Sequence, residues 1–467
     1  MVFGVVILTN YLACAQNTLS LKQCVESAIA NNPIVKQSDV QLQNASVNLR
    51  QARDNQLPDL LANLNHGINQ GRSIDPFTNG YVNQNISYGN YNIGTNITVY
   101  NGSELKNLVK QNKLIYEADK MDVQQVKDNL TLSVILAYLQ VLTNDDLLTQ
   151  SNNQLLLTQK EVDRLTILNN QGAIVPAQLY DLKGQLGNDQ LALINVQNAL
   201  ATAKISLCQL MNTPYDKTLK VQPITAEEYA SAYDGDPNKI YQLAVSQLAV
   251  VKAARLRRQS ANASVQVANG EFYPRIGFGA GLSTNYSSAA TKSIFVNSIP
   301  VPSGDFVTVG GIQIPVITSK SNYNTQKVQY FDQFSNNYST SVNLNIRIPI
   351  VNGFQAKNKV ALAKNDVKNY QYQEEVVEVQ LRQAIELAYV NMVTSGETYI
   401  TLLQQVSDFN QSFHSAGVRF EAGASTQVEY LIAKNNADRA QINLISARYD
   451  YILRRKILDY YQGKFVL

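Results

Sequence analysis

Side chains that could bind a metal ion or perform acid–base chemistry are few and scattered along this sequence. Its 2 histidines, His66 and His414, are far apart, and no cysteine or carboxylate set stands near them at metal-ligand spacing. The glycine-rich segment 277–281 resembles a nucleotide-binding loop only superficially, since strand-like alternation continues through it and no crossover helix follows. No combination of serine, histidine and aspartate has motif support. We therefore expect no catalytic site, no metal and no cofactor, and the protein is not expected to be an enzyme.

Charge is sparse and nearly balanced. Charged residues make up 16% of the 467 residues, against a usual ~25%. The 39 Lys and Arg against 36 Asp and Glu give a net charge of +3, which provides no electrostatic basis for binding nucleic acid. A basic cluster at Lys252, Arg255, Arg257 and Arg258 is expected to lie on a solvated helix face. Function must therefore come from the architecture.

The N-terminus has the features of a secretory leader. An apolar stretch is followed by an Ala-Cys-Ala cleavage pattern, which predicts a signal peptide at 1–15 and a mature chain that begins at Gln16. Cys14 could instead be an acylated lipoprotein cysteine, although the residues before it make a poor lipobox. After cleavage only Cys24 and Cys208 remain, which excludes a disulfide framework. Both lie in helix-patterned segments and are expected to be buried as small apolar side chains.

The chain contains two copies of one pattern. Gly102 and Gly353 each follow an asparagine and lie 251 positions apart, and Gly172 and Gly423, each an interruption in a helical run, are also 251 apart. Two equal offsets indicate a duplication in one register. The predicted division is a signal peptide at 1–15, a first repeat at 16–212 (β-hairpin about 59–100, long helices 103–212), a connector at 213–237 with a short helix at 225–233, and a second repeat at 238–467 (β-hairpin about 275–351, long helices 354–462).

Very long helices dominate both copies. From Ser103 to Asn170 there are 68 residues without proline or glycine, and apolar residues recur at helical spacing. A helix of this length measures roughly 100 Å at 1.5 Å per residue, more than one globular domain accommodates. Coiled-coil packing of long helices is therefore predicted. The alternative is a set of shorter bundle helices.

The strands have the pattern of transmembrane β-strands. Ile346, Ile348 and Ile350 continue an alternation that starts at Tyr338, with polar residues between the apolar ones as far as Arg347, and segments 276–284 and 93–99 alternate in the same way. Membrane-spanning strands need about 9–11 residues, whereas no segment approaches the ~18 consecutive apolar residues of a membrane-spanning helix. A soluble sandwich strand would look similar in isolation. Four strands cannot close a membrane barrel, which needs about 8, so each chain is expected to supply a fraction of a barrel that closes by oligomerisation; three chains would give twelve strands.

The order of these elements is similar to that of a known family. The segments that carry the likeness are Leu57-Pro58, Tyr273-Pro274, Ile348–Gly353, the helix–Gly–helix tips Asn169–Ala173 and Arg419–Ser425, and Leu431–Ala433. The chain resembles the TolC/OprM-like outer membrane efflux proteins. The resemblance implies an α+β membrane fold: a homotrimeric twelve-stranded β-barrel in the Gram-negative outer membrane, continued by a twelve-helix coiled-coil tunnel in the periplasm.

The resemblance also implies partners and topology. Such a trimer would be the exit duct of a tripartite pump for small toxic compounds, with a periplasmic adaptor and an inner-membrane transporter of RND, ABC or MFS type. Loops 71–84 and 287–335 would face outside the cell, and the connector would join an equatorial belt. The prolines that precede the strands, Pro58 and Pro274, are 216 positions apart, whereas the glycines that follow the strands, Gly102 and Gly353, are 251 apart. The second copy therefore has 35 extra residues between its proline and its glycine, and these would lengthen the second outer loop. Interfacial tyrosines are expected at positions 88, 91, 286 and 338.

The resemblance places adaptor docking at the two helical tips. The candidates are the tip residues Gly172, Ala173, Gly423, Ala424 and Ser425. The alternative to docking is that these residues only form tight turns, since glycine tolerates positive φ. Ser425 stands where the best-known members carry an arginine.

The periplasmic entrance would lie just past the tips, where family members place acidic residues. Glu429, six after Gly423, is the first candidate, and Asp181 is a second one. The alternative for both is a solvated helix face. Phe420 occupies the position of a gate tyrosine, and Ile432 that of a second acid, so a closing network would differ here and could use Arg419.

Two rival functions remain open at this stage. The duct of a type I protein secretion system shares the same fold, and nothing in the sequence separates it from an efflux duct. A non-conducting trimeric coiled-coil scaffold would not need alternating lipid-facing strands.

Overall fold

The computed structural model describes residues 18–75, 79–224 and 235–464. Three expectations concern residues outside these ranges: the signal peptide at 1–15, the acylation of Cys14 and the short helix at 225–233. The described chain forms two compact units, one of helices and one built around a β-sheet. Each is described by itself below.

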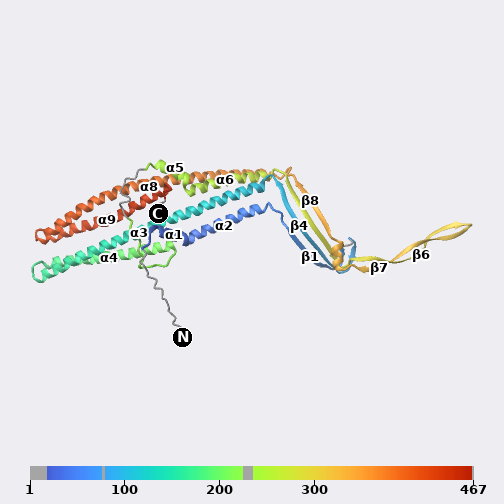
Figure 1. The fold of residues 1–467 in the computed structure, drawn as a ribbon, viewed down its shortest axis with the longest axis horizontal. Coiled ribbons are helices and arrows are strands. Elements are labelled where there is room, and N and C mark those ends of the chain that lie inside the picture. The colour runs from blue at the N-terminus through green and yellow to red at the C-terminus, as the bar shows by residue number, and fades with distance from the viewer. Residues whose placement is uncertain (1–17, 76–78, 225–234, 465–467) are drawn as a thin grey trace, which may run out of the picture. The chain divides into compact units, whose positions relative to one another are not determined.

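Helices and strands alternate in the same order in the two halves of the chain (Figure 1). The helices are α1 (Leu21–Asn31), α2 (Pro33–Asp54), α3 (Glu104–Asn170), α4 (Pro176–Met211), α5 (Pro237–Gln247), α6 (Ala249–Gly270), α7 (Tyr330–Asn336), α8 (Gln355–Glu421) and α9 (Gln427–Tyr461). The strands are β1 (Leu61–Asn69), β2 (Arg72–Ile74), β3 (Tyr81–Asn83), β4 (Ile86–Asn101), β5 (Arg275–Ser287), β6 (Thr291–Val309), β7 (Ile312–Lys327) and β8 (Ser339–Arg347).

The long helices form two hairpins, α3 with α4 and α8 with α9 (Figure 1). α3 and α8 are each 67 residues long, which confirms uninterrupted helices of roughly 100 Å over these long runs. α4 and α9 have 36 and 35 residues. The matching lengths follow from the duplication.

Three apolar cores hold the described part of the helical unit together, and the smallest joins α3 to α4 near the tips through Val162, Leu165, Leu179 and Leu182. In the first, α1 packs against α3 and α4, and buried residues include Val134, Tyr138 and Leu207. The second core joins α5 and α6 to α8 and α9 through buried residues such as Ile240 and Ile385. Each N-terminal helix pair therefore covers the long hairpin of its own repeat, while α9 contributes to both cores. Cys24 and Cys208 are buried free thiols of the first core, as expected.

Each N-terminal helix of the repeats is divided in two, which the sequence analysis did not predict. α1 ends at Asn31, and Asn32 adopts an extended conformation before Pro33 begins α2. The Asn32 side chain stabilises the break, because its Nδ2 donates to the Leu210 carbonyl at 3.0 Å and its Oδ1 accepts from the Ile34 N–H at 2.9 Å. Proline favours the first helical position, so the second helix restarts there.

Lys252 of the basic cluster on α6 is exposed, but the three arginines of the cluster pair with carboxylates of neighbouring helices. Arg255 pairs with Glu374 at 3.3 Å and Glu378 at 2.9 Å, both on α8. Arg257 contacts Asp119 at 3.6 Å on α3. For the arginines the expectation was wrong because the periodicity of one helix does not show which charged residues a neighbouring helix presents.

The sheet unit contains an antiparallel four-stranded sheet in the order β1-β4-β5-β8. β1 pairs with β4 from Leu61↔Gly94 to Asn69↔Ile86, and β5 pairs with β8 from Arg275↔Arg347 to Ser283↔Ser339. The four predicted strands are thus present in one sheet. The loops that connect them also contain two hairpins that the sequence analysis did not predict, β2–β3 and β6–β7.

Candidate functional site

The four-stranded sheet has one polar and one apolar face. Paired residues in an antiparallel sheet share a face, and successive residues alternate between faces. The apolar face includes Ala62, Leu64, Ile68, Ile93, Ile97, Ile276, Phe278, Ala280, Leu282, Val342, Leu344 and Ile346. The opposite face includes Asn63, Asn65, Asn90, Asn92, Asn96, Gly277, Gly279, Gly281, Ser283, Asn285, Ser339, Ser341, Asn343 and Asn345. The alternation that predicted membrane strands is therefore in register across all four strands.

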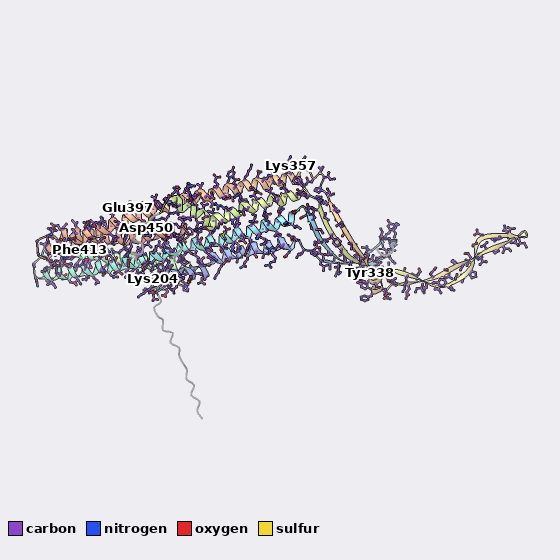
Figure 2. All side chains as sticks on the ribbon, turned by 45° about the horizontal axis from the view of Figure 1, so that its top comes forward. Lys204, Tyr338, Lys357, Glu397, Phe413 and Asp450 are labelled. Carbon is purple, nitrogen blue, oxygen red and sulfur yellow. The ribbon has the colours of Figure 1, made fainter. Side chains whose placement is uncertain are left out.

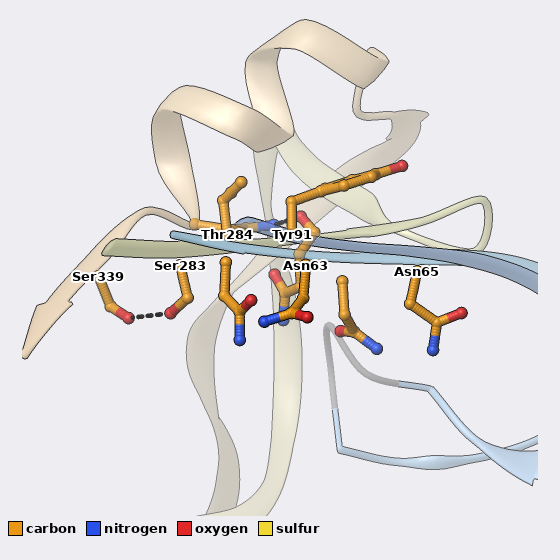
Figure 3. Close-up of a pocket in the computed structure, with 10 residues that line it drawn as sticks. Asn63, Asn65, Tyr91, Ser283, Thr284 and Ser339 are labelled. Carbon is orange, nitrogen blue, oxygen red and sulfur yellow. Dashed lines mark hydrogen bonds between the residues drawn. The ribbon is translucent and has the colours of Figure 1, made fainter. Parts of the chain in front are cut away.

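The polar face is lined by amides and hydroxyl groups. Asn63 and Asn65 project from one side of the sheet together with Ser283, whereas Tyr91 and Thr284 project from the other (Figure 3). The Ser283 and Ser339 hydroxyl oxygens lie 2.9 Å apart and share a hydrogen bond (Figure 3). Such a face suits contact with water.

Neither outer edge of this sheet is paired within the described chain. β1 and β8 each have a single neighbour in the order β1-β4-β5-β8. An edge strand presents a row of unpaired N–H and C=O groups, and in lipid each such group costs several kcal/mol. A sheet with one lipid-compatible face and two open edges needs further strands to close it.

Aromatic side chains gather at one end of the apolar face. The Tyr91 hydroxyl lies 2.8 Å from His66 Nδ1 and 2.9 Å from the Tyr330 hydroxyl. Tyr330 on α7 packs on Tyr286 and Phe334 with ring centroids 4.6 and 5.1 Å away. Amphipathic rings in this position are typical of the interfacial girdle of membrane barrels.

Two of the four expected girdle tyrosines, Tyr91 and Tyr286, lie on this apolar face. Tyr338 is exposed immediately before β8 (Figure 2). Tyr88 is on the polar face, where its ring covers Gly67 on β1. The alternation within one segment cannot distinguish these cases, because only the register between strands shows which tyrosines share a face.

The helical hairpins end in matching turns at the two predicted tips. After α3, the Gly172 N–H donates to the Asn169 carbonyl at 3.0 Å and the Ala173 N–H to the Leu168 carbonyl at 2.9 Å. After α8, the Gly423 and Ala424 N–H groups donate in the same way at 3.1 and 2.8 Å. This is the Schellman motif, which requires a left-handed residue after the helix, and both glycines have positive φ (66° and 70°). Local turn chemistry thus explains both glycines.

The tips present small, exposed groups. Gly172, Ala173, Gly423 and Ala424 are exposed and Ser425 is half-buried. Apart from the adjacent residues in the chain, no heavy atom of the described residues lies within 4 Å of the position a Cβ would take on either glycine. A partner could therefore approach the backbone closely at these turns.

The entrance candidates differ in their surroundings. Glu429 is exposed in the first turn of α9, and its N–H donates to the Thr426 cap at 3.3 Å. A carboxylate there is stabilised by the helix dipole, so a local role accounts for it as well. Asp181 is exposed on α4, about one turn further from its tip than Glu429 is from its own. Arg419 is exposed at the end of α8.

Phe420 packs between the two hairpins instead of lying on an exposed surface. Its ring stacks on Tyr430 at 5.0 Å between centroids, and the Arg164 guanidinium lies 5.1 Å from its centre. Burial raises the pKa of Tyr430 to about 12. Near this point Gln427 Nε2 donates to the Gln178 carbonyl at 2.7 Å, which joins α9 to α4. Phe420, Arg164 and Gln427 thus connect the first hairpin to the second.

A buried ion pair joins the same helices beyond the tips. The Lys434 side chain on α9 is 1% exposed, and its Nζ lies 2.7 Å from Asp438 and 3.4 Å from Asp189 on α4. Asp189 also accepts hydrogen bonds from Thr158 at 2.5 Å and Gln185 at 2.8 Å. Sequence reasoning missed this group, because no local pattern pairs a lysine with a carboxylate 245 positions away.

Comparison with known proteins identifies the fold. Residues 24–213 and 240–463 match the profile of the family described as outer membrane efflux protein. The chain belongs to the outer membrane efflux protein family. The resemblance found in the sequence is thereby confirmed, as is the α+β class. Outer membrane efflux proteins are homotrimeric channels of the Gram-negative outer membrane with a β-barrel and a helical periplasmic tunnel.

Among relatives, outer membrane protein TolC of Salmonella enteritidis is 21% identical over 450 residues, covering 95% of this chain and 82% of that protein. Outer membrane protein TolC of Escherichia coli is 21% identical over 445 residues, covering 93% and 80%. These relatives are similar along nearly the whole chain.

Solved structures of this architecture are also similar. VceC, an outer membrane protein of Vibrio cholerae, superposes with a TM-score of 0.73 at 16% identity, covering 96% of this chain and 97% of that one. The CmeC outer membrane channel of Campylobacter jejuni gives 0.75 at 13% identity, covering 95% and 86%. Within the described residues, only α4 has a window apolar enough for a membrane span (mean hydropathy 1.2), which is weak evidence by itself.

Proposed function

We propose that the trimer is the exit duct of a tripartite pump. It would receive small toxic compounds from a periplasmic adaptor and an inner-membrane transporter of the RND, ABC or MFS type and release them outside the cell. The observation that carries the proposal is the four-stranded sheet with one apolar face, one amide-lined face and two open edges. Three such sheets joined edge to edge would form a barrel with lipid outside and water inside.

The repeat division belongs to the same proposal. Residues 16–212 and 238–467 would each supply one helical hairpin and one pair of barrel strands, and residues 213–237 would join an equatorial belt. One contact supports the belt: Leu19 and Val221 form a parallel bridge, and the Tyr138 hydroxyl donates to the Leu19 and Gln222 carbonyls at 3.1 and 2.7 Å.

Adaptor docking is proposed at the tips formed by Gly172, Ala173, Gly423, Ala424 and Ser425. Their exposure and small size support this assignment, since helix ends of a partner can approach such turns closely. The glycines are already explained as turn formers, so the test must use the neighbouring alanines.

The entrance is proposed to be lined by Glu429, Asp181 and Arg419. Three symmetric copies of each acid would give carboxylate rings, which attract cations. Phe420 would act at the entrance indirectly, because it is held between Arg164 and Tyr430. Opening would then require the second hairpin to separate from the first at the Gln427–Gln178 and Phe420–Arg164 contacts.

Conductance in planar bilayers tests the duct, and drug susceptibility tests the tips. Purified trimer should conduct, and a preparation that inserts but carries no current would refute the channel.

Ala424→Arg should abolish drug resistance without changing trimer yield or conductance. Asn152→Arg, an exposed substitution on α3 away from the tip, is the matched control. Equal resistance in both variants would remove the tips from the docking proposal.

Glu429→Gln should weaken block of the conductance by divalent cations, and unchanged block would leave Glu429 only its role at the helix dipole.

A further inference from the structure

The β6–β7 hairpin lies in the second outer loop, which carries the 35-residue insertion, and it exposes many apolar side chains. Its strands have 19 and 16 residues and pair with each other from Thr291↔Lys327 to Val309↔Ile312, and within the described chain they pair with no other strand (Figure 1). An isolated two-stranded hairpin is at best marginally stable in water. A hairpin this long therefore needs a surface that covers it.

The two faces of this hairpin differ. The register places on one face a set of β-branched side chains, here called the Val/Ile face: Ile294, Ile299, Val301, Val307, Val309, Ile312, Ile314 and Val316. The half of this face far from the tip also carries polar side chains: Lys292, Asn297, Thr318, Lys320, Asn322, Asn324 and Gln326. Around the tip, Val309 is 58% exposed and Ile312 70%. The other face carries the polar pair Thr308 and Gln313 next to the tip, and further along it carries proline, aromatic and serine side chains: Phe295, Ser298, Pro300, Pro302, Phe306, Pro315, Ile317, Ser319, Ser321 and Tyr323. Only the Val/Ile face therefore has an unbroken aliphatic surface at the tip.

The edges of the hairpin are poorly suited to adding a strand. Three prolines remove N–H donors, and the register shifts between Phe295 and Asn297 and between Pro302 and Phe306 interrupt the ladder. Prolines and bulges are the usual means of preventing edge-to-edge association. A partner would therefore bind the Val/Ile face and would not extend the sheet.

Lipid is an unsuitable cover for this surface. A two-stranded hairpin has two open edges, and every unpaired backbone group costs several kcal/mol in hydrocarbon. A protein surface on one face leaves the edges in water. Packing against a second sheet, about 10 Å away, is the common way to cover such a face.

The trimer supplies this second surface at high local concentration. β7 leads through α7 to β8, the open edge along which the next protomer must pair. Each trimer therefore carries three identical hairpins tethered near one another, and tethered copies can bind one another without the cost of recruiting a separate partner.

We propose that the β6–β7 hairpins of the three protomers pack on one another through their Val/Ile faces outside the barrel. The assignment rests on the proposed trimer and adds an interface between the outer loops. The hairpins form an apolar collar at the outer end of the duct, independent of adaptor docking.

Cysteine cross-linking in intact outer membranes tests the collar. Ile314→Cys lies on the Val/Ile face, and Gln313→Cys is its matched neighbour on the other face. The natural Cys24 and Cys208 are buried, so the wild-type protein is the background. After mild oxidation Ile314→Cys should form disulfide-linked dimers involving about two thirds of the protomers, since one cysteine of three remains unpaired. Gln313→Cys should form few.

Labelling with a membrane-impermeant maleimide gives a second measurement. Ile314→Cys should react at least tenfold more slowly than Gln313→Cys before oxidation. Equal labelling, or equal cross-linking of both faces, would overturn the proposal. Slow labelling of Ile314→Cys without cross-linking would also overturn it, because a different molecule would then cover the face. Cross-linking and labelling test the collar, and conductance tests the duct. If the collar is overturned while the trimer still conducts, the exit-duct proposal stands. A trimer that does not conduct counts against the duct and leaves the collar untouched.

Discussion

Replacing Lys434 by methionine should loosen the second helical hairpin from the first. Lys434 lies between Asp189 and Asp438, and its side chain is only 1% exposed. Methionine keeps most of the apolar volume but leaves Asp189 as a buried carboxylate without its cation. Removing one partner of a buried ion pair typically costs about 3–5 kcal/mol. Because Thr158 and Gln185 still donate hydrogen bonds to Asp189, we expect the lower end, about 3 kcal/mol.

Hydrogen exchange of the detergent-solubilised trimer measures this change locally. A loss of about 3 kcal/mol should accelerate exchange of α9 amides near Lys434 on the order of a hundredfold, since each 1.4 kcal/mol is about tenfold. Asp189→Asn should cost less, because Lys434 keeps Asp438 at 2.7 Å. Lys160→Met, an exposed lysine on α3, is the control and should change nothing.

The double variant Lys434→Met with Asp189→Leu decides whether the pair is coupled. Replacing both charges by apolar groups removes the uncompensated carboxylate, so exchange should be slower than in Lys434→Met alone. Faster exchange in the double variant, or α9 protection unchanged by Lys434→Met, would refute the view that this ion pair fastens the hairpins together.

Three further expectations concern the helical unit. Gly423→Ala should lower stability by about 1 kcal/mol because alanine is strained at positive φ, whereas Gly184→Ala, inside α4, should raise it by about 0.5–1 kcal/mol; thermal unfolding compares them. Burial raises the pKa of Tyr430 from 10.0 to about 12, so the unfolded chain loses this proton first, and between about pH 10 and pH 12 this group should lower stability by about 1.4 kcal/mol per pH unit; Tyr430→Phe should remove that share of the slope in alkaline unfolding curves. Tyr138→Phe removes two hydrogen bonds to backbone carbonyls and should speed amide exchange at the N-terminal bridge without altering conductance.

The elements set by local sequence were predictable. The run without proline and glycine predicted α3 nearly to the residue, and Gly172 and Gly423 marked both turns because a Schellman motif needs a left-handed residue. The alternation in β8 was equally informative, since Val342, Leu344 and Ile346 share one face of the sheet. In each case the signal depends on residues close together in the chain.

Features set by contacts between distant segments were not predictable. The Lys434–Asp189 pair and the Arg255–Glu374 pair join helices whose relative rotation is fixed only by packing. The family likeness places Phe420 at the position of a gate tyrosine, but its ring is held by Arg164, which only the folded hairpins bring near. The β6–β7 hairpin was missed because its prolines and serines lower strand propensity, while pairing along its length compensates.

The amide-rich face of the sheet has a consequence for movement along the duct. Among the described residues of the four strands, the only charged side chains on this face are those of Arg275 and Arg347, which pair with each other at one end of the sheet. Amide groups both donate and accept hydrogen bonds, so a solute that loses hydrogen bonds to water can form similar ones to the wall at each position. Its free energy should therefore vary little along this face, without tight binding sites or high barriers. Discrimination between cargoes would then be completed upstream, and the outer part of the passage would release whatever reaches it.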